Sequence, residues 1–470
     1  MLRKYIGDRA FYRHVIAVAL PIIIQNGIAN FVSLLDNIMV GQIGTVQMNG
    51  VSIVNQLIFV FNLCIFGATS GAGIFTAQFH GCGDHNGVRS TFRFKILIGL
   101  LLSALGVGIF LCFGQPLISL YLQGEGTVED IAATLDHGRT YLLIMLWGLP
   151  AFAISNAYAG TLRESGQTVV PMAASTTAVF VNLGLNWVLI FGHFGIAPMG
   201  VRGAAIATVV SRYVELAIVA IWAHAHPGKL PFIRGALRSL YIPAPLLKQI
   251  IVKGMPLLLN EALWSTAMAI MNQCYSTRGL DVVAALNINS AIYNLSSVVY
   301  MAMGNAVGII IGQMLGAGKS EQAVRDTDRK LIVTSVLSCL IFGLLMVAVS
   351  GLFPQIYNTT DQVRALATKL ICISALFMPF YAFTNATYFT LRSGGQTWIT
   401  FVYDSCFVWA VCVSLAFCLS RFTTLSILPL YAICHGADVI KCFLGGAMFK
   451  QGKWIRNLTA KERNKLLFGD

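Results

Sequence analysis

The chain has 470 residues, of which 56% are hydrophobic and only 11% are charged. Soluble globular proteins carry about 25% charged residues, so this composition excludes an ordinary soluble domain and indicates a polytopic membrane protein. The formal net charge of +13 is gathered in predicted loops on one side of the membrane. Topology therefore explains the charge, and no nucleic-acid partner is expected.

Twelve apolar runs, each long enough to cross a bilayer as a helix, follow one another along the chain. They lie at about residues 14–40, 48–78, 94–114, 138–162, 169–192, 203–224, 247–273, 283–313, 330–352, 364–391, 398–419 and 425–448. The prediction is an all-α protein with twelve transmembrane helices in the lipid bilayer. The 11 cysteines show no CxxC spacing, so we expect small buried side chains and no disulfide.

Basic residues mark one side of the predicted membrane. An even number of spans places both chain ends on that side, with Lys- and Arg-rich loops and the tail residues Lys450, Lys453, Arg456, Lys461, Arg463 and Lys465. The longest loop on the other side is acidic and contains Glu125, Glu129, Asp130 and Asp136. Cytoplasmic loops carry the excess of Lys and Arg, so we expect a cell-membrane protein with both termini in the cytoplasm.

An internal repeat divides the chain into two similar halves. The segment "AISNAYAGTLRESGQT" (153–168) lines up with "AFTNATYFTLRSGGQT" (382–397), and "AQFHGCGD" (77–84) lines up with "GQMLGAGK" (312–319). We predict two pseudo-symmetric six-helix lobes at residues 1–224 and 247–448, joined by a cytoplasmic loop at 225–246 and followed by a basic tail at 449–470. Parallel repeats of this kind are typical of alternating-access transporters.

Polar side chains form a stripe on the first predicted span, and the repeat places a similar stripe on the seventh. The spacings of four, three and four residues place the first stripe on one helical face, directed toward a central cavity. We assign to a substrate cavity Asn26, Asn30, Ser33, Asn37, Asn156, Ser265, Asn272, Tyr381 and Asn385. The alternative, that the neutral residues among them only hold helices together, stays open.

Four prolines occur in pairs at equivalent positions of the repeat. Pro21 pairs with Pro256, and Pro150 pairs with Pro379. A proline inside a helix frees a backbone carbonyl and weakens or bends the helix. We therefore predict that these residues act as structural hinges.

Three acidic residues within predicted spans have no visible basic partner: Asp36, Glu261 and Asp404. Burial disfavours the charged form of such an acid, so it can bind and release a proton, or hold Na⁺ together with nearby amide and hydroxyl oxygens. Two further acids have a basic residue three positions away and are expected to form the ion pairs Arg212–Glu215 and Asp438–Lys441. The segment "HGCGDH" (80–85) has potential metal ligands, but its repeat counterpart "LGAGKS" has none, so we expect no metal site.

At these residues the chain resembles the multidrug and toxic compound extrusion (MATE) family. The matching segments are "LPIII…LLDNIMVGQIG", the "GQxxGAGK"-type turn of each half, "LRxxGQT", "VNLGLNWVLIFG" and "GVRGAAIAT". The resemblance implies a V-shaped pair of six-helix lobes. It also implies secondary antiport, in which H⁺ or Na⁺ enters while a cationic or amphipathic organic compound leaves. We expect a monomer without any cofactor beyond the coupling ion.

The family's coupling residues are carried over only where the motif matches. Asp36 resembles the coupling carboxylate of the N-terminal lobe, Asn182 and Asn186 match positions that line its cation site, and Thr208 matches a further contributor. Many prokaryotic members have a second Asp where Asn186 stands here, so this chain has one fewer negative charge. In the C-terminal lobe, Glu261 falls where many relatives have a functional Glu, with Asp404 as a second candidate.

Two other functions are compatible with a membrane protein. A flippase for lipid-linked precursors is expected to have basic cavity residues, whereas the span interiors here are acidic and rich in amides. A membrane-embedded enzyme needs a paired base and nucleophile within its spans. His435 is the main histidine within a span, and no convincing partner for it is visible in the sequence. Efflux of cationic compounds is therefore preferred, and the protein is not expected to be an enzyme.

Overall fold

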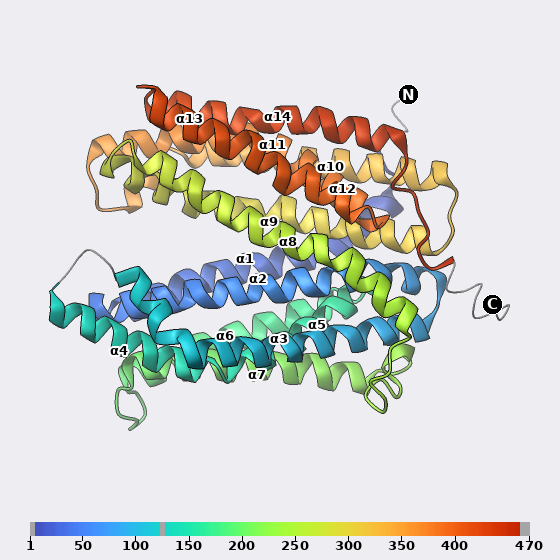
Figure 1. The fold of residues 1–470 in the computed structure, drawn as a ribbon, viewed down its shortest axis with the longest axis horizontal. Helices are drawn as coiled ribbons and strands as arrows, with labels where there is room; N and C mark the ends of the chain where they lie inside the picture. Colours follow the sequence, from blue (N-terminus) through green and yellow to red (C-terminus); the bar gives the residue numbers. More distant parts are fainter. Residues whose placement is uncertain (1–4, 123–126, 461–470) are drawn as a thin grey trace. The chain divides into compact units, whose positions relative to one another are not determined.

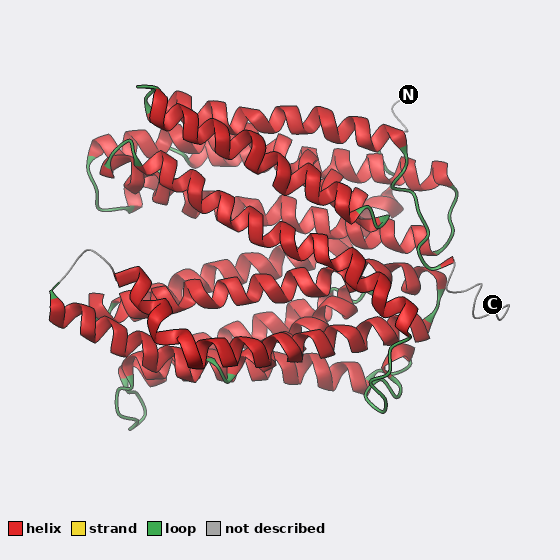
Figure 2. Ribbon diagram, in the orientation of Figure 1, coloured by secondary structure: helices red, strands yellow, loops and turns green. Residues whose placement is uncertain are grey.

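The computed structural model describes residues 5–122 and 127–460, apart from the side chains of Leu34 and Asn37. Within these ranges all regular structure is helical (Figures 1 and 2). The α-helices are α1 (Arg9–Gly41), α2 (Thr45–Cys82), α3 (His85–Ser119), α4 (Val128–Met145), α5 (Gly148–Glu164), α6 (Val169–Phe191), α7 (Gly200–Ala225), α8 (Ala244–Ser276), α9 (Leu280–Gly316), α10 (Glu321–Val349), α11 (Asp361–Ser393), α12 (Thr397–Phe401), α13 (Ser414–Phe422) and α14 (Ile427–Gln451).

Each of the twelve predicted spans falls on helix, so the all-α membrane fold is confirmed. By length and composition, ten helices of the described chain can cross a membrane, and the bent pair α4–α5 brings the number to eleven. Helix α8, which covers the predicted seventh span, is not among them. Asn260, Glu261, Ser265 and Thr266 interrupt its apolar run, which lowers its mean hydropathy.

The fourth predicted span, 138–162, differs most from the expectation. It consists of two helices, α4 and α5, which meet at an angle of 48°. Pro150 lies in the first turn of α5, where a proline costs no hydrogen bond. Pro21, Pro256 and Pro379 lie inside α1, α8 and α11, which continue through them. Their role as hinges stays a prediction.

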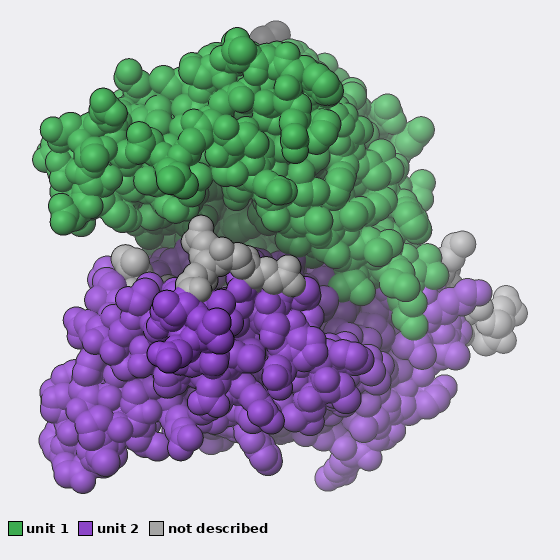
Figure 3. Space-filling model, turned by 60° about the vertical axis from the view of Figure 1, so that its left-hand side comes forward, with its two compact units in different colours: residues 1–23, 77–84, 251–470 green, residues 24–76, 85–250 purple. Residues whose placement is uncertain are grey.

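The chain divides into two compact units, shown in green and purple in Figure 3. Unit 1 comprises residues 1–23, 77–84 and 251–470, and unit 2 comprises residues 24–76 and 85–250. Unit 2 has an apolar core around Val54, Ile65 and Leu149. The core of unit 1 includes Leu370 and Leu430, which are fully buried.

The described part of the C-terminal tail packs within unit 1. The side chain of Trp454 is fully buried. The backbone N–H of Leu458 donates to Oε1 of Gln78 at 2.7 Å, and Nε2 of Gln78 donates to the carbonyl of Ser393 at 2.9 Å. The predicted basic tail therefore begins with a docked segment.

Candidate functional site

Asp36 on α1 lies against Asn186 on α6, and both residues belong to unit 2. Nδ2 of Asn186 donates a hydrogen bond to Oδ1 of Asp36 at 2.7 Å. Asn186 is 2% exposed and Asp36 is half-buried, so this bond is partly shielded from solvent. The bond joins two of the residues that the sequence predicted for ion coupling.

Asn182 and Thr208 complete the same polar cluster. Asn182 stands one helical turn before Asn186 on α6. When the Asn182 amide is oriented with its nitrogen toward the acid, that nitrogen lies 3.0 Å from each carboxylate oxygen of Asp36. Its oxygen then accepts the backbone N–H of Thr208 on α7 at 3.3 Å. The structure thus brings together Asp36, Asn182, Asn186 and Thr208.

The charge of Asp36 is not balanced by a direct ion pair among the residues that the structure describes. Oδ1 of the buried Asn186 amide has no hydrogen-bond partner there either. A half-buried carboxylate without a counterion and an unsatisfied buried amide oxygen are both costly in a low-dielectric interior. A proton would relieve the cost of the carboxylate, and a small cation that also binds the amide oxygen would relieve both costs, so the cluster has the chemistry of a cation site.

A second polar group in unit 2 involves Arg163, which sequence reasoning did not single out. Its Nη2 donates to Oε1 of Gln25 on α1 at 3.0 Å, so this bond joins α5 to α1. Glu215 interacts electrostatically with both Arg163 and Arg212. Arg212 and Glu215 were expected to form an ion pair, but no direct ion pair joins them in the part of the chain that the structure describes. The prediction considered one helix, whereas α5 supplies a second arginine.

In unit 1, Asp404 does have a basic partner, which corrects the expectation that it is unpaired. Nζ of Lys441 on α14 forms an ion pair with Oδ1 of Asp404, and Nδ2 of Asn260 donates to Oδ2 at 3.0 Å. Asn260 is held in turn by Ser405, whose hydroxyl donates to its Oδ1 at 2.7 Å. Lys441 was expected to pair with Asp438, which instead interacts with it electrostatically.

Glu261 lies near this pair on α8 and is half-buried. It interacts electrostatically with Asp404 and with Arg392 on α11. Arg392 is the repeat counterpart of Arg163, so both copies of the "LRxxGQT" segment supply an arginine to a polar group within a unit. This shared arginine was visible in the repeat and could have been recognised from the sequence.

The predicted cavity residues fall on both units. Asn30 and Ser33 are exposed on α1, Asn272 is exposed on α8, and Asn26, Asn156, Ser265 and Asn385 are half-buried. Tyr381 is buried, and its hydroxyl forms a hydrogen bond with Nδ1 of His435. Tyr381 is therefore the partner of His435 that the sequence did not reveal. The Asn37 side chain lies outside the described residues.

Two buried charged positions were missed entirely. Lys95 on α3 is 1% exposed and forms an ion pair with Glu164, and its Nζ also donates to Thr161 at 3.3 Å. Asp328 on α10 is fully buried and accepts the hydroxyl of Thr390 at 2.8 Å and 3.0 Å. Their partners lie on other helices, so spacing along one helix gives no signal. No group of three or more potential metal ligands is found in the described chain.

The helical fold and the buried charged groups within it define a polytopic membrane protein. The MatE family model matches residues 21–188 and 256–418, in both halves of the repeat. The chain therefore belongs to the MatE family. Members of this family are membrane transporters, so the protein is a transporter and not an enzyme.

Curated relatives span nearly the same length. The chain is 25% identical over 460 residues to "Probable multidrug resistance protein NorM" from Thermotoga maritima, covering 97% of this chain and 96% of that protein. It is 27% identical over 395 residues to the protein of the same name from Pseudomonas aeruginosa, covering 82% of this chain and 78% of that protein.

Solved structures share the fold. One is described as the outward-facing conformation of a multidrug resistance MATE family transporter of the MOP superfamily. It has a TM-score of 0.84 and 18% identity, and the match covers 96% of this chain and 98% of that one. A second, described as MATE in the straight conformation, has a TM-score of 0.83 and 19% identity over the same shares of the chains. At these identities the likeness establishes the fold alone.

Proposed function

We propose that this protein is a secondary multidrug efflux antiporter, which exports cationic or amphipathic organic compounds in exchange for H⁺ or Na⁺. The curated relatives named multidrug resistance proteins support this proposal. The coupling ion binds at Asp36, with Asn182, Asn186 and Thr208 around it. Glu261 and the Asp404–Lys441 pair form a second candidate site in unit 1.

The observation that carries the proposal is the Asp36 cluster. An intramembrane carboxylate without a direct ion pair is costly, and such residues commonly mark ion pathways. Binding of a cation neutralises Asp36 and changes which helix packing is favoured. The cation then binds one conformation more tightly than the other, and this difference in affinity couples an ion gradient to the conformational change.

The two candidate ions make different demands on this cluster. A proton needs a single carboxylate oxygen and leaves the Asn186 bond in place. Na⁺ needs several oxygen ligands, so Asn186 must turn its Oδ1, which has no partner among the described atoms, toward the acid. Proton coupling therefore requires less rearrangement, and Na⁺ coupling requires rotation of the amide.

The test is uptake of an organic cation into proteoliposomes under an imposed pH gradient and, separately, an imposed Na⁺ gradient. Asp36→Asn is expected to lower gradient-driven flux about tenfold, which corresponds to about 1.4 kcal/mol of lost coupling. Glu261→Gln, measured beside it, reports on unit 1. Asp136→Asn is the matched control, because Asp136 is an exposed acid on α4.

Two outcomes would contradict the proposal, and the control shows whether the assay is specific. Parent-like flux and ion dependence in both Asp36→Asn and Glu261→Gln would remove these acids from the coupling mechanism. If neither gradient drives cation flux in the parent protein, antiport is wrong and a flippase for lipid-linked precursors becomes the preferred assignment. Loss of flux in the Asp136→Asn control would show that the assay reports general damage.

The proposal includes a monomer in the cell membrane with both termini in the cytoplasm. Membrane orientation is testable with an impermeant thiol reagent on intact cells, in a background where the exposed cysteines Cys112 and Cys418 are replaced by serine. A cysteine introduced at Gly195, in the loop between α6 and α7, is expected to react from outside. A cysteine at Gly228, in the loop between α7 and α8, is expected to react only after lysis. The opposite pattern contradicts the orientation.

A further inference from the structure

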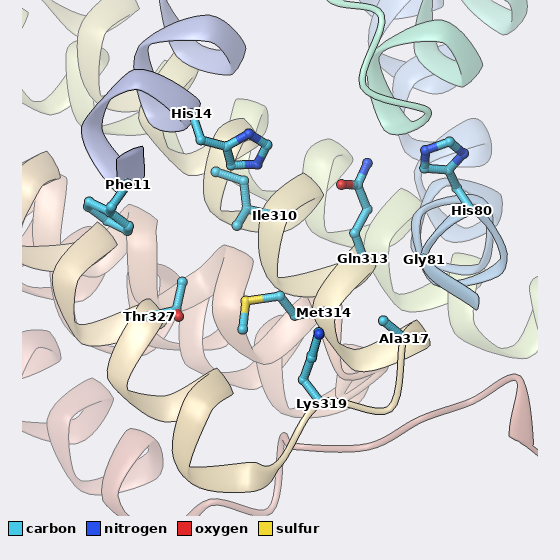
Figure 4. Close-up of a pocket in the computed structure, with 10 residues that line it drawn as sticks. All are labelled: Phe11, His14, His80, Gly81, Ile310, Gln313, Met314, Ala317, Lys319 and Thr327. Atoms are coloured by element: carbon cyan, nitrogen blue, oxygen red, sulfur yellow. The ribbon is translucent and has the colours of Figure 1, made fainter. Parts of the chain in front are cut away.

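Unit 1 contains a cavity of about 410 Å³ at the end of its helix bundle where the α2–α3 and α9–α10 turns lie (Figure 4). It is formed by the first turns of α1, the last turn of α2, the end of α9 and the start of α10. Its lining residues are Phe11, His14, His80, Gly81, Ile310, Gln313, Met314, Ala317, Lys319 and Thr327. None of them belongs to the proposed coupling sites.

The lining combines basic and apolar side chains. His14, His80 and Lys319 come from three different segments, and none of the lining residues is acidic. Phe11 and Met314 supply an apolar wall. In Figure 4 the Lys319 side chain extends toward Met314 at the centre of the view. The cavity is therefore suited to an anion that carries an apolar group.

Three acidic side chains of unit 1, on α10 and just before α1, have local partners. On α10, Glu321 pairs with Arg325 at 2.6 Å, and Asp326 pairs with Arg329 at 3.2 Å. Asp8, just before α1, accepts a backbone N–H three residues further on at 2.7 Å. These carboxylates form local ion pairs or cap a helix. The ion pairs of Glu321 and Asp326 on α10 are thus made with arginines of the same helix and not with the basic residues that line the cavity.

The internal repeat shows that these basic residues are not required by the shared fold. At the spacing that relates the two halves, the counterparts of His14, His80 and Lys319 are Gln249, Leu315 and Asp84. Gln313, by contrast, has Gln78 as its counterpart and belongs to the common framework. The basic lining is therefore a feature of this one cavity.

We propose that this cavity binds the phosphate group of an anionic phospholipid from the adjoining leaflet. Basic pockets between transmembrane helices bind lipid head groups, and cytoplasmic leaflets supply anionic lipids. Lys319 contributes a fixed positive charge, the His14 imidazole can supply a hydrogen bond, and the apolar wall receives the glycerol and first methylenes. A free phosphate ion would make no favourable contact with the apolar wall. We therefore prefer a lipid as the source of the phosphate group.

Such a lipid would connect segments that are far apart in the sequence. A ligand that binds only the folded state raises the stability of that state. The full-length protein in detergent is therefore expected to show a higher Tm with phosphatidylglycerol than with phosphatidylcholine. Native mass spectrometry is expected to show about tenfold greater retention of phosphatidylglycerol, a factor that corresponds to about 1.4 kcal/mol.

The variants that test the site remove its charge without removing bulk. His14→Gln combined with Lys319→Gln is expected to abolish the preference for phosphatidylglycerol. Arg238→Gln combined with Lys248→Gln is the matched control, because it removes two exposed basic residues that do not line the cavity. His80→Leu, which introduces the residue of the repeat counterpart, is a second variant if the first does not fold.

Three results would overturn the proposal. The parent protein could retain both lipids equally, or the cavity variants could keep the preference for phosphatidylglycerol. The third is that inorganic phosphate alone reproduces the rise in Tm, which would assign the cavity to a free anion. Loss of the preference in the cavity variants together with its persistence in the control supports a lipid site.

Discussion

Gly81 near the end of α2 and Gly316 at the end of α9 each lie against the backbone of the other helix, at equivalent positions of the internal repeat. A Cβ atom on Gly81 would lie 2.0 Å from the carbonyl oxygen of Gln313, and one on Gly316 would lie 1.9 Å from that of Gln78. Gln78 and Gln313 are repeat counterparts too. The crossing is therefore reciprocal and depends on glycine in both halves.

Substituting either glycine should separate these helices. Neighbouring small residues, Ala77 and Gly312, also meet at the crossing, which is the pattern that lets membrane helices approach closely. Gly81→Ala and Gly316→Ala are each expected to destabilise the protein by about 1–3 kcal/mol through overpacking. Thermal unfolding in detergent measures the loss. Gly108→Ala on α3 is the control, because its Cβ would meet no atom within 4 Å; an equal loss there would contradict the crossing.

The ion pair between Lys441 and Asp404 predicts that the stability losses of the two single variants do not add in the double variant. Lys441 is 6% exposed, so removing either partner leaves a buried or half-buried charge without its direct ion pair, with Asp438 as the remaining acid that interacts with Lys441. Lys441→Gln and Asp404→Asn should each cost about 3–5 kcal/mol, and the double variant should recover much of that loss. The measurement is a double-mutant cycle on thermal unfolding. Losses that simply add in the double variant would show that the two groups do not depend on each other.

The membrane fold and the polar cluster around Asp36 were largely predictable from the sequence. Runs of apolar residues indicate spans directly, because the bilayer sets their length. The grouping of Asp36 with Asn186 came from motif resemblance, since hydrogen bonds between α1 and α6 leave no periodic signal. The internal repeat also indicated which features the two halves share. These sources together locate a site but do not give its contacts.

The contacts between helices were the part that the sequence did not reveal. Asp404 had no basic residue at helical spacing, yet Lys441 reaches it from α14. The single predicted span at 138–162 is bent by 48° between α4 and α5, a break that hydropathy alone does not mark. Helical periodicity describes one helix at a time, so partners on neighbouring helices need the packed structure.

Asp328 provides a test of a buried acid outside the proposed coupling sites. It is fully buried, and its hydrogen bonds in the described chain come from the Thr390 hydroxyl. Asn has the same shape without the cost of burying a charge, so Asp328→Asn should leave the thermal stability unchanged or raise it. Asp328→Ala and Thr390→Val should each lower it, by roughly 1–3 kcal/mol, because a buried polar group loses its partner. A large loss in Asp328→Asn would reveal a requirement for the carboxylate.

The variant Asn186→Asp tests what determines the cation selectivity of the cluster around Asp36. The change places a second carboxylate at the position of the amide nitrogen, which is 2.7 Å from Asp36. Two carboxylates at this distance repel each other unless a cation lies between them, so the variant should hold Na⁺ or a proton more tightly than the parent. The Thr208 hydroxyl oxygen nearby, and the Asn182 amide oxygen once that amide rotates, favour Na⁺ as that cation. We expect flux under an imposed Na⁺ gradient to rise about tenfold relative to flux under a pH gradient.

The assay for this change is cation uptake into proteoliposomes under each gradient in turn. Asn182→Asp is the matched comparison, since it adds the same charge one turn earlier on α6. If Na⁺-driven flux in Asn186→Asp equals that of the parent, the amide at this position does not determine ion selectivity. If both gradients lose their effect, the second carboxylate has trapped the bound cation, and a raised affinity should be visible as a Tm that increases with Na⁺ concentration.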